Sequence, residues 1–541
     1  MNIKSVVHKT NLLLVGALGF APHPAQAELK PVSKSNIFLT RTIGRLLLSL
    51  LVIFGSTKMA MAADGGGATD SRPNQAGTNR PNVLFLIVDD LNTLLLGDTN
   101  RYAGKVIAPN MTRLADSGVN FTRNFAAAPK CEPSRTSFLS GVVPWKSGVY
   151  DNGYDVNSSP GLKGAVSLPA YFRQHGYYAA SYGKVSHGWD MGELDDLTGH
   201  KRDPIPPGAP LNGYSKDRKG KVTENDWGPI GIPESEMNDT KRADEAIAQL
   251  KRKHDKPFFV ACGLFHPHMA AYSPKKYFDL YPLDSILLPP TIPNDLDDVP
   301  PLGQELAHTS AFAEIAAHHQ WKNAIQGYLA STTYADGQIG RILAALESSP
   351  YKDNTIVVLI SDNGFHIGEK EHWQKSTLWE EATHVLMMFR VPGLTQPHQV
   401  CNRIVSLMDV YPTLVELAGL PKPSSIAGNS IVPLLKDCNT PWDHPDLMAY
   451  QSNMSVRNDG YRLIRYKDGT TEFYDEAKDP HEWTNQTKNP EYAEIQRKMA
   501  AMLPAQAAMA PSVDDMRGGN GKSKTKSKTK SKQKNQYPGE E

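Results

Sequence analysis

The sequence contains short, continuous apolar runs that end abruptly in polar residues. A run of this kind, bounded by turn residues, is typical of a strand buried on both faces of a parallel sheet. The four runs are residues 82–88, 177–181, 257–265 and 355–360. In an open α/β sheet, ligands bind beyond the carboxyl ends of the strands. The polar residues that follow the four runs are therefore expected to meet in one site.

Segments with apolar residues at helical spacing separate these predicted strands. They are residues 111–117, 241–253 and 321–347. A further helix is expected to begin at Asp409, as an acidic N-cap, and to end at Gly419. Alternating strands and helices predict an α/β fold with a large, doubly wound mixed sheet flanked by helices.

The pattern changes near residue 441. Residues 461–466 and 472–475 flank a turn that contains Gly469, which predicts a hairpin, and residues 493–503 predict a closing helix. We therefore expect a small C-terminal antiparallel sheet plus a helix.

Two long segments lack any periodicity. Residues 188–235 and 280–320 are rich in Pro, Gly, Asp and Lys, and loops of this length in a compact domain are usually functional or disordered. We interpret them as insertions that shape a substrate pocket. Within them, residues 226–229 are either a wall of that pocket or a plain surface loop.

The charge of the chain is unevenly distributed. The 541 residues carry a net charge of +1, with +6 on residues 1–63 and +6 on residues 517–541, which leaves −11 on the body. An acidic body argues against general nucleic-acid binding. An anionic substrate must therefore be attracted by a local cationic site.

The N-terminal region contains two export-like signals. Residues 11–21 and 46–54 are apolar, follow Lys or Arg residues and precede small-residue cleavage sites, and we expect the second signal to be used. Neither run reaches the ~20 residues that span a bilayer. A periplasmic or secreted protein without a transmembrane span is therefore expected. The predicted divisions are an export region at 1–63, a flexible linker at 64–80, a catalytic domain at 81–440, a C-terminal subdomain at 441–510 and a disordered Lys-rich tail at 511–541.

Cys131 stands at the start of a short predicted helix. Pro133 suits the first helical turn and Gly141 the position after the helix end, so the cysteine faces the positive end of the helix dipole. A lone cysteine in this position is more often a small buried hydrophobe than a reactive group. The spacing of the other cysteines fits no disulfide scaffold or zinc site. Whether Cys401 and Cys438 pair stays open.

Oxygen ligands follow the first and the last apolar run, two residues in each case. Asp89, Asp90, Asp362 and Asn363 suit Ca²⁺ or Mg²⁺ better than zinc. Acidic residues after a strand are also typical of helix N-caps and turns. The pattern by itself leaves both interpretations open.

The cysteine motif resembles the signature of the type I sulfatases. The matching residues are Cys131, Pro133, Ser134, Arg135, Leu139 and Gly141. The resemblance implies that a formylglycine-generating maturation enzyme oxidises Cys131 to formylglycine, whose hydrate supplies the nucleophile. It also implies a divalent cation, Ca²⁺ ahead of Mg²⁺. Its ligands would be Asp89, Asp90, the modified Cys131, Asp362 and Asn363, where many relatives have His in place of Asn363.

The same resemblance implies catalytic roles for five further residues. Arg135 would orient the hydrated aldehyde, and Lys184 and His187 would hold it, with His187 later removing a proton to expel sulfate. His268 and Lys375 would bind sulfate oxygens and protonate the departing alcohol. A single His or Lys is otherwise usually a surface or structural residue.

Two more histidines are expected either to support the catalytic residues without contacting the substrate or to be structural. They are His266 and His384. At His266 the chain departs from relatives that have histidine at the position of Phe265.

Two stretches resemble the iduronate-2-sulfatase group most. They are residues 324–331 and 367–375. This resemblance implies a sulfated glycan substrate, such as a 2-O-sulfated uronic acid in a polysaccharide. Two alternatives stay open: a phosphate or phosphonate monoester hydrolase of the same superfamily, and an inactive carbohydrate-binding relative.

Overall fold

The computed structural model describes residues 80–93, 101–216, 220–308, 311–506 and 509–512. The two export-like signals, the linker up to residue 79 and the tail from residue 513 lie outside these residues. Within the described part, no helix combines the length and apolar character that a membrane span requires.

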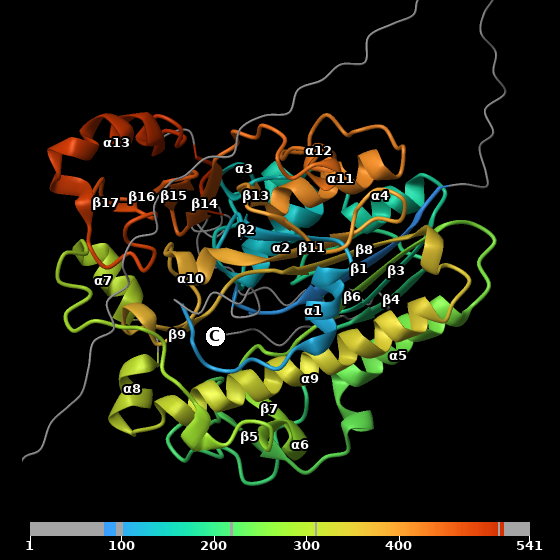
Figure 1. Ribbon diagram of the computed structural model, residues 1–541, viewed down its shortest axis with the longest axis horizontal. Helices are drawn as coiled ribbons and strands as arrows, with labels where there is room; N and C mark the ends of the chain where they lie inside the picture. Colours follow the sequence, from blue (N-terminus) through green and yellow to red (C-terminus); the bar gives the residue numbers. More distant parts are fainter. Residues whose placement is uncertain (1–79, 94–100, 217–219, 309–310, 507–508, 513–541) are drawn as a thin grey trace, which may run out of the picture. The chain divides into compact units, whose positions relative to one another are not determined.

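A nine-stranded mixed sheet lies at the centre of the fold (Figure 1). Its order is β12-β2-β11-β8-β1-β6-β3-β4, and β13 pairs with β2. The strands are β1 Asn82–Val88, β2 Val119–Phe125, β3 Tyr178–Gly183, β4 Asp196–Gly199, β6 Phe258–Leu264, β8 Thr355–Ser361, β11 His384–Arg390, β12 Gln399–Cys401 and β13 Val405–Ser406. The four predicted strands are confirmed as β1, β3, β6 and β8, which are adjacent and parallel. Their carboxyl ends therefore share one edge.

Helices cover both faces of this sheet (Figure 1). One face carries α1 Pro109–Asp116, α5 Asn238–Lys251 and α9 Trp321–Glu347, and the other carries α2 Cys131–Ser140, α4 Leu168–Gln174, α11 Val410–Leu417 and α12 Val432–Lys436. Alternate residues of β1 enter the two cores: Phe85 and Ile87 pack on one side, and Leu86 and Val88 on the other. The predicted doubly wound architecture is confirmed.

A four-stranded antiparallel sheet follows the main sheet. It contains β14 Asp446–Tyr450, β15 Asn453–Arg457, β16 Tyr461–Arg465 and β17 Thr471–Asp475, and α13 Ala493–Ala500 packs nearby (Figure 1). The predicted hairpin and closing helix are confirmed. Buried Arg462 of β16 joins this sheet to α10, Glu380–Thr383, through an ion pair with Glu380.

The remaining elements are short. They are α3 Pro144–Ser147, α6 Lys275–Phe278, α7 Pro301–His308, α8 Phe312–Ala317, β5 Trp227–Ile230, β7 Ala271–Pro274, β9 His366–Ile367 and β10 Trp373–Gln374. The 3-10 helices are Val156–Ser158, Pro160–Leu162, Glu234–Glu236, Leu283–Ser285, Lys352–Asn354, Glu369–Glu371, Leu407–Asp409, Gln486–Lys488 and Pro490–Tyr492.

Three local predictions differ from the structure in part. Residues 226–229 do not form a plain surface loop, because Trp227 is buried in β5, which pairs with β7. The segment 280–320 contains two helices, α7 and α8, too short for a periodic pattern. Asp409 is the N-cap residue of α11, as predicted, but its side chain does not cap that helix; with Ser406 it forms a capping box one turn earlier.

Candidate active site

The acidic residues that follow β1 and β8 lie side by side. Val88 and Ser361, the last residues of these neighbouring strands, are directly paired, so the chains enter the site together. The backbone N–H of Asp90 donates a hydrogen bond to Oδ1 of Asp362 at 3.0 Å. Asp90 has a φ of 57°, a left-handed conformation that is uncommon for a residue with a side chain.

These acids form a compact, buried group of oxygen donors. Carboxylate oxygens of Asp89, Asp90 and Asp362 lie within 4.8 Å of one another, and all three side chains are completely buried. Burial raises the pKa of Asp90, and burial together with the neighbouring carboxylates raises the pKa of Asp362 to about 7. Close buried carboxylates repel one another, and nearby positive charge relieves this repulsion.

Asn363 completes this group. Its Nδ2 donates a hydrogen bond to Oδ1 of Asp90 at 2.9 Å, while its buried Oδ1 has no hydrogen-bond partner among the described residues. An orphaned amide oxygen beside three carboxylates is the donor set that Ca²⁺ and Mg²⁺ prefer. The residues present therefore fit a divalent cation.

Arg135 forms ion pairs with two of these acids, Asp89 and Asp362. Its Nε lies 2.8 Å from Oδ2 of Asp362, and its Nη2 lies 2.9 Å from Oδ1 of Asp89. Although burial alone would raise the pKa of Asp89, the charges of Lys184 and Arg135 hold it well below its usual range. Asp89 is therefore kept ionised.

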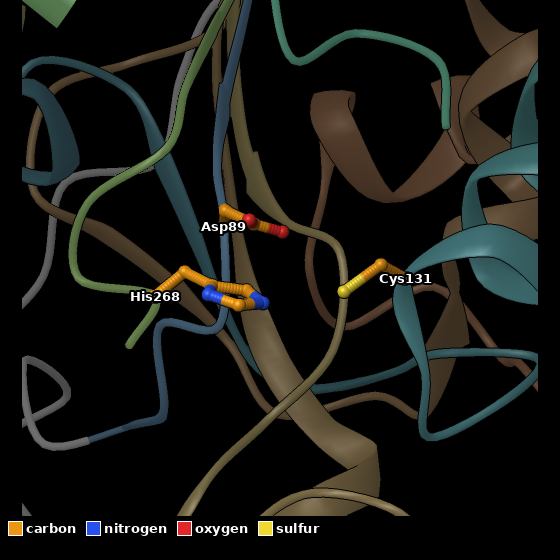
Figure 2. Close-up of side chains that lie close together, drawn as sticks. All are labelled: Asp89, Cys131 and His268. Atoms are coloured by element: carbon orange, nitrogen blue, oxygen red, sulfur yellow. The ribbon is translucent and has the colours of Figure 1, made fainter. Parts of the chain in front are cut away.

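Cys131 is the first residue of α2, as predicted, and Gly141 ends that helix with a φ of 72°. Figure 2 shows Asp89, Cys131 and His268 directed toward one space, and their ligand atoms lie within 4.8 Å of one another. The thiol lies 3.6 Å from Oδ1 of Asp90. Burial and then the charge of Asp89 raise the pKa of the thiol well above its usual value, which disfavours a nucleophilic thiolate.

The other cysteines are free thiols as well. Cys401 and Cys438, whose pairing the sequence left open, form no disulfide, and neither does Cys262. Cys401 and Cys262 are buried.

Cationic and imidazole groups meet the same acids. Nζ of Lys184 lies 2.6 Å from Oδ2 of Asp89, and Nζ of Lys375 lies 2.5 Å from Oδ2 of Asp90. Nε2 of His268 lies 3.7 Å from Oδ2 of Asp90. His187 is half-buried and follows Lys184 by three residues at the end of β3. The predicted lysines and His268 are therefore brought together with the acids, whereas the role of His187 rests on its position.

The loop that carries Lys375 has an unusual backbone. Gln374 and Ser376, on either side of Lys375, have φ values of 83° and 85°. His372 holds the same loop, because its ring nitrogens lie 2.7 Å from the carbonyl oxygen of Lys375 and 2.8 Å from that of Ala307 in α7. These contacts aim the Lys375 side chain at Asp90.

Phe265, the position where relatives have histidine, is a neighbour of the site that the sequence did not assign a role. Its ring centroid lies 5.2 Å from Nζ of Lys184 and 4.6 Å from the centroid of His268. His200, just after β4, stacks on the other part of the ring at 4.5 Å. An apolar residue at the end of an apolar run carries no signal for such a position.

The two histidines expected to be structural are held by hydrogen bonds. His266 lies 2.7 Å from Oδ2 of Asp239; burial opposes its protonation, but this carboxylate raises its pKa. His384 contacts the carbonyl oxygen of Thr122 at 2.7 Å.

Comparison with known proteins decides the family. The family model described as Sulfatase matches residues 81–420, which is more than half of the chain. The chain belongs to the sulfatase family. A second model, described as N-sulphoglucosamine sulphohydrolase, C-terminal, matches residues 368–508. The resemblance of the Cys131 motif to the type I sulfatases is confirmed, and the protein is a sulfuric ester hydrolase.

Individual relatives agree with this assignment. A sulfatase of Formosa agariphila is 36% identical over 446 residues, covering 80% of this chain and 87% of the relative. Human iduronate 2-sulfatase is 31% identical over 431 residues, covering 70% and 75%. The solved phosphonate monoester hydrolase of Silicibacter pomeroyi has a TM-score of 0.67 at 20% identity, covering 78% and 94%, and shares the fold of this sulfatase.

Proposed function

We propose that this sulfatase removes sulfate from a sulfated carbohydrate, a 2-O-sulfated uronic acid in a polysaccharide, with a formylglycine made from Cys131. The observation that carries the proposal is the meeting of Cys131 with the three buried aspartates at one sheet edge. The sugar is supported by the 31% identity to human iduronate 2-sulfatase.

A bound Ca²⁺ is part of this proposal. Asp89, Asp90, Asp362 and Asn363 would hold it together with the modified residue 131. Ca²⁺ is preferred to Mg²⁺ because it accepts six to eight oxygen ligands in flexible geometry, whereas Mg²⁺ demands a near-ideal octahedron. When bound, the cation supplies positive charge that orients and polarises the groups around sulfur.

The protein residues supply charge and proton transfer. The hydrated aldehyde formed from Cys131 would supply the attacking oxygen. Lys184, which pairs with Asp89, would hold the hydrated aldehyde together with His187. Lys375, which pairs with Asp90, would bind the sulfate oxygens and stabilise their negative charge. Arg135 keeps the acids in place. His268 donates a proton to the departing alcohol, and His187 removes one at residue 131 so that sulfate is released.

The proposal includes a maturation partner and an export route. Oxidation of the thiol to an aldehyde requires a formylglycine-generating enzyme that acts on the Cys131 motif. Cleavage of the second signal near residue 62 would deliver the protein to the periplasm or outside the cell. The division into a catalytic domain at 81–440 and a C-terminal subdomain at 441–510 belongs to the same proposal.

Sulfate release from defined oligosaccharides tests the function. Protein co-expressed with a formylglycine-generating enzyme should release sulfate from a 2-O-sulfated uronate disaccharide, and the Cys131→Ala variant should release none. Mass spectrometry of the peptide that contains residue 131 should show loss of H₂S and gain of one oxygen. Full turnover by an unmodified cysteine form would overturn the proposal.

The alternative activity has its own test. Because the phosphonate monoester hydrolase of Silicibacter pomeroyi shares the fold, aryl phosphates and phosphonates are the alternative substrates to compare. We expect kcat/KM for an aryl sulfate to exceed that for the matching phosphate and phosphonate. The reverse order would assign the site to phosphoryl chemistry. An unmodified Cys131 in protein from the native host, with glycan affinity and no turnover, would identify an inactive relative.

A further inference from the structure

Lys130, directly before Cys131, is a cation that the roles assigned above do not use. It is the N-cap residue of α2 and has extended backbone angles, with φ −159° and ψ 147°. Its Nζ lies 2.6 Å from Oδ1 of Asp151 and 5.8 Å from the ring centroid of Tyr450. The side chain is 22% exposed. The ammonium group is therefore anchored but still reachable from solvent.

Asp151 connects Lys130 to the C-terminal subdomain. Its Oδ2 accepts hydrogen bonds from Nε2 of Gln451 at 2.6 Å and from the hydroxyl of Tyr450 at 3.4 Å. Gln451 and Ser452 form the two-residue turn between β14 and β15, with φ values of 46° and 68°. Such turns favour Gly or Asn, so the sequence places Gln451 there at a conformational cost.

Lys130 also lies close to the proposed sulfate-binding lysine. The backbone N–H of Ser376, next to Lys375, donates to the carbonyl oxygen of Pro129 at 3.0 Å. Burial opposes the charge of Lys130, yet Tyr450 and Asp151 raise its pKa, while the charge of Lys375 acts in the opposite direction. Two ammonium groups thus lie within electrostatic reach of each other.

The hydrogen-bond capacity of Lys130 is not exhausted. An ammonium group has three donors. Asp151 and the hydroxyl of Tyr450 account for two of them. Among the residues that the structure describes, these are the partners of this ammonium group, and its third N–H can bind a ligand.

We propose that Lys130 binds a second anionic group of the substrate, next to the sulfate that Lys375 binds. The group is the carboxylate of the sulfated uronic acid, or a further sulfate with the same charge. This inference rests on the proposed function, because it assigns part of the same pocket. Asp151 is the positioning residue that orients Lys130, and Gln451 and Tyr450 hold Asp151. The cluster makes the enzyme select polyanionic sugars over neutral sulfate esters.

Matched substrates test this inference in the mature enzyme. Lys130→Gln should raise KM about 10- to 100-fold for a 2-O-sulfated uronate disaccharide, the range expected for losing a hydrogen bond to a charged group. It should leave kcat/KM for a neutral aryl sulfate unchanged. For the carboxyl-reduced disaccharide, wild type and variant should have equal KM values. A disulfated disaccharide without a carboxylate distinguishes the two possible anions. If Lys130→Gln also raises KM for this substrate, the group that Lys130 binds is a second sulfate.

Two further variants supply the controls. Lys146→Gln removes an exposed lysine of α3 and should change no kinetic constant. Asp151→Asn should raise KM for the uronate substrate at constant kcat, which general loss of structure would not do. Equal losses on every substrate, or unchanged KM values in Lys130→Gln, would overturn the inference.

A binding measurement separates this inference from the proposed function. Calorimetry with a desulfated uronate disaccharide needs no turnover. Wild type should bind it at least about tenfold more tightly than Lys130→Gln. If no substrate is desulfated but this difference is found, the proposed function fails while the anion site stands; equal affinities would overturn the site.

Discussion

Nε of Arg135 lies 2.8 Å from Oδ2 of Asp362, and both side chains are completely buried. The same guanidinium reaches Asp89, so one planar cation sets the relative position of two acids. Lysine cannot span both. We expect Arg135→Lys to lower kcat by about 100-fold, the scale of an ångström-sized misplacement. Steady-state kinetics on an aryl sulfate would measure this, with the exposed Arg113→Lys as control; unchanged kcat would contradict the assignment.

Removing the divalent cation should abolish activity and lower stability. Close buried carboxylates that lose a bound cation repel one another. A cation present at 100 times its Kd stabilises the folded state by about 2.7 kcal/mol. We expect chelation to lower Tm, and Ca²⁺ to restore Tm and activity better than Mg²⁺. In Asp362→Asn, Tm should no longer change on chelation or on addition of Ca²⁺. If Tm of the parent protein does not depend on Ca²⁺, the cation site is refuted.

Phe265 should matter for turnover although it carries no reactive group. Its ring contacts Lys184 and His268, so a smaller side chain lets both shift. We expect Phe265→Leu to lower kcat by about 10- to 100-fold. Phe389→Leu, a substitution in the core at β11, is the matched control. Equal kinetic effects of the two substitutions would show that Phe265 has no specific role.

Arg462 should be a major source of stability. It is completely buried, lies 2.6 Å from Glu482 and also pairs with Glu380. Removing one partner of a buried ion pair costs about 3–5 kcal/mol, because the remaining charge is left uncompensated. Urea unfolding of Arg462→Met should show this loss, whereas exposed Arg497→Met should stay near the parent. A loss below about 1 kcal/mol would contradict the role of the pair.

His200 should make stability depend on pH. Burial and then the charge of Lys184 lower its pKa from 6.5 to about 3. Between these values the unfolded state binds more protons, so the contribution of His200 to stability rises with pH and is complete above 6.5. His200→Phe keeps the stack on Phe265 and removes the titration. We expect the variant to gain stability over the parent at pH 5 and lose this advantage at pH 7, measured by urea unfolding. The same difference at both pH values would contradict the shifted pKa.

The strands of the sheet were predictable because a strand that is buried on both faces has a continuous run of apolar residues in the sequence. Every position of β1 from Val83 to Val88 is apolar, because the strand is buried on both faces, and the apolar run stops at Asp89, directly after the strand. The same reasoning identified β8 and β6. It missed α7 and misjudged Trp227, because short elements depend on packing partners that are far away in the sequence.

The candidate site was predictable only in part. Strand-end acids and the Cys131 motif are local signals, and parallel strands bring such ends to one edge. His200 carries no such signal, and at Phe265 the comparison with relatives marked the position without giving the phenylalanine a role, which comes from the residues that it contacts. The contact between Asp151 and Gln451 joins positions 300 residues apart, and no spacing rule anticipates it.

The sequence by itself determined the strands that end in acids, the helix that begins at Cys131 and the residue types able to hold a cation. It did so because periodicity, capping and ligand chemistry act over a few neighbouring residues. The tertiary structure alone decided which cations face which carboxylates, that Phe265 contacts both Lys184 and His268, and that Lys130 lies beside the C-terminal hairpin. Those relations depend on how distant segments pack, and packing is a property of the whole chain.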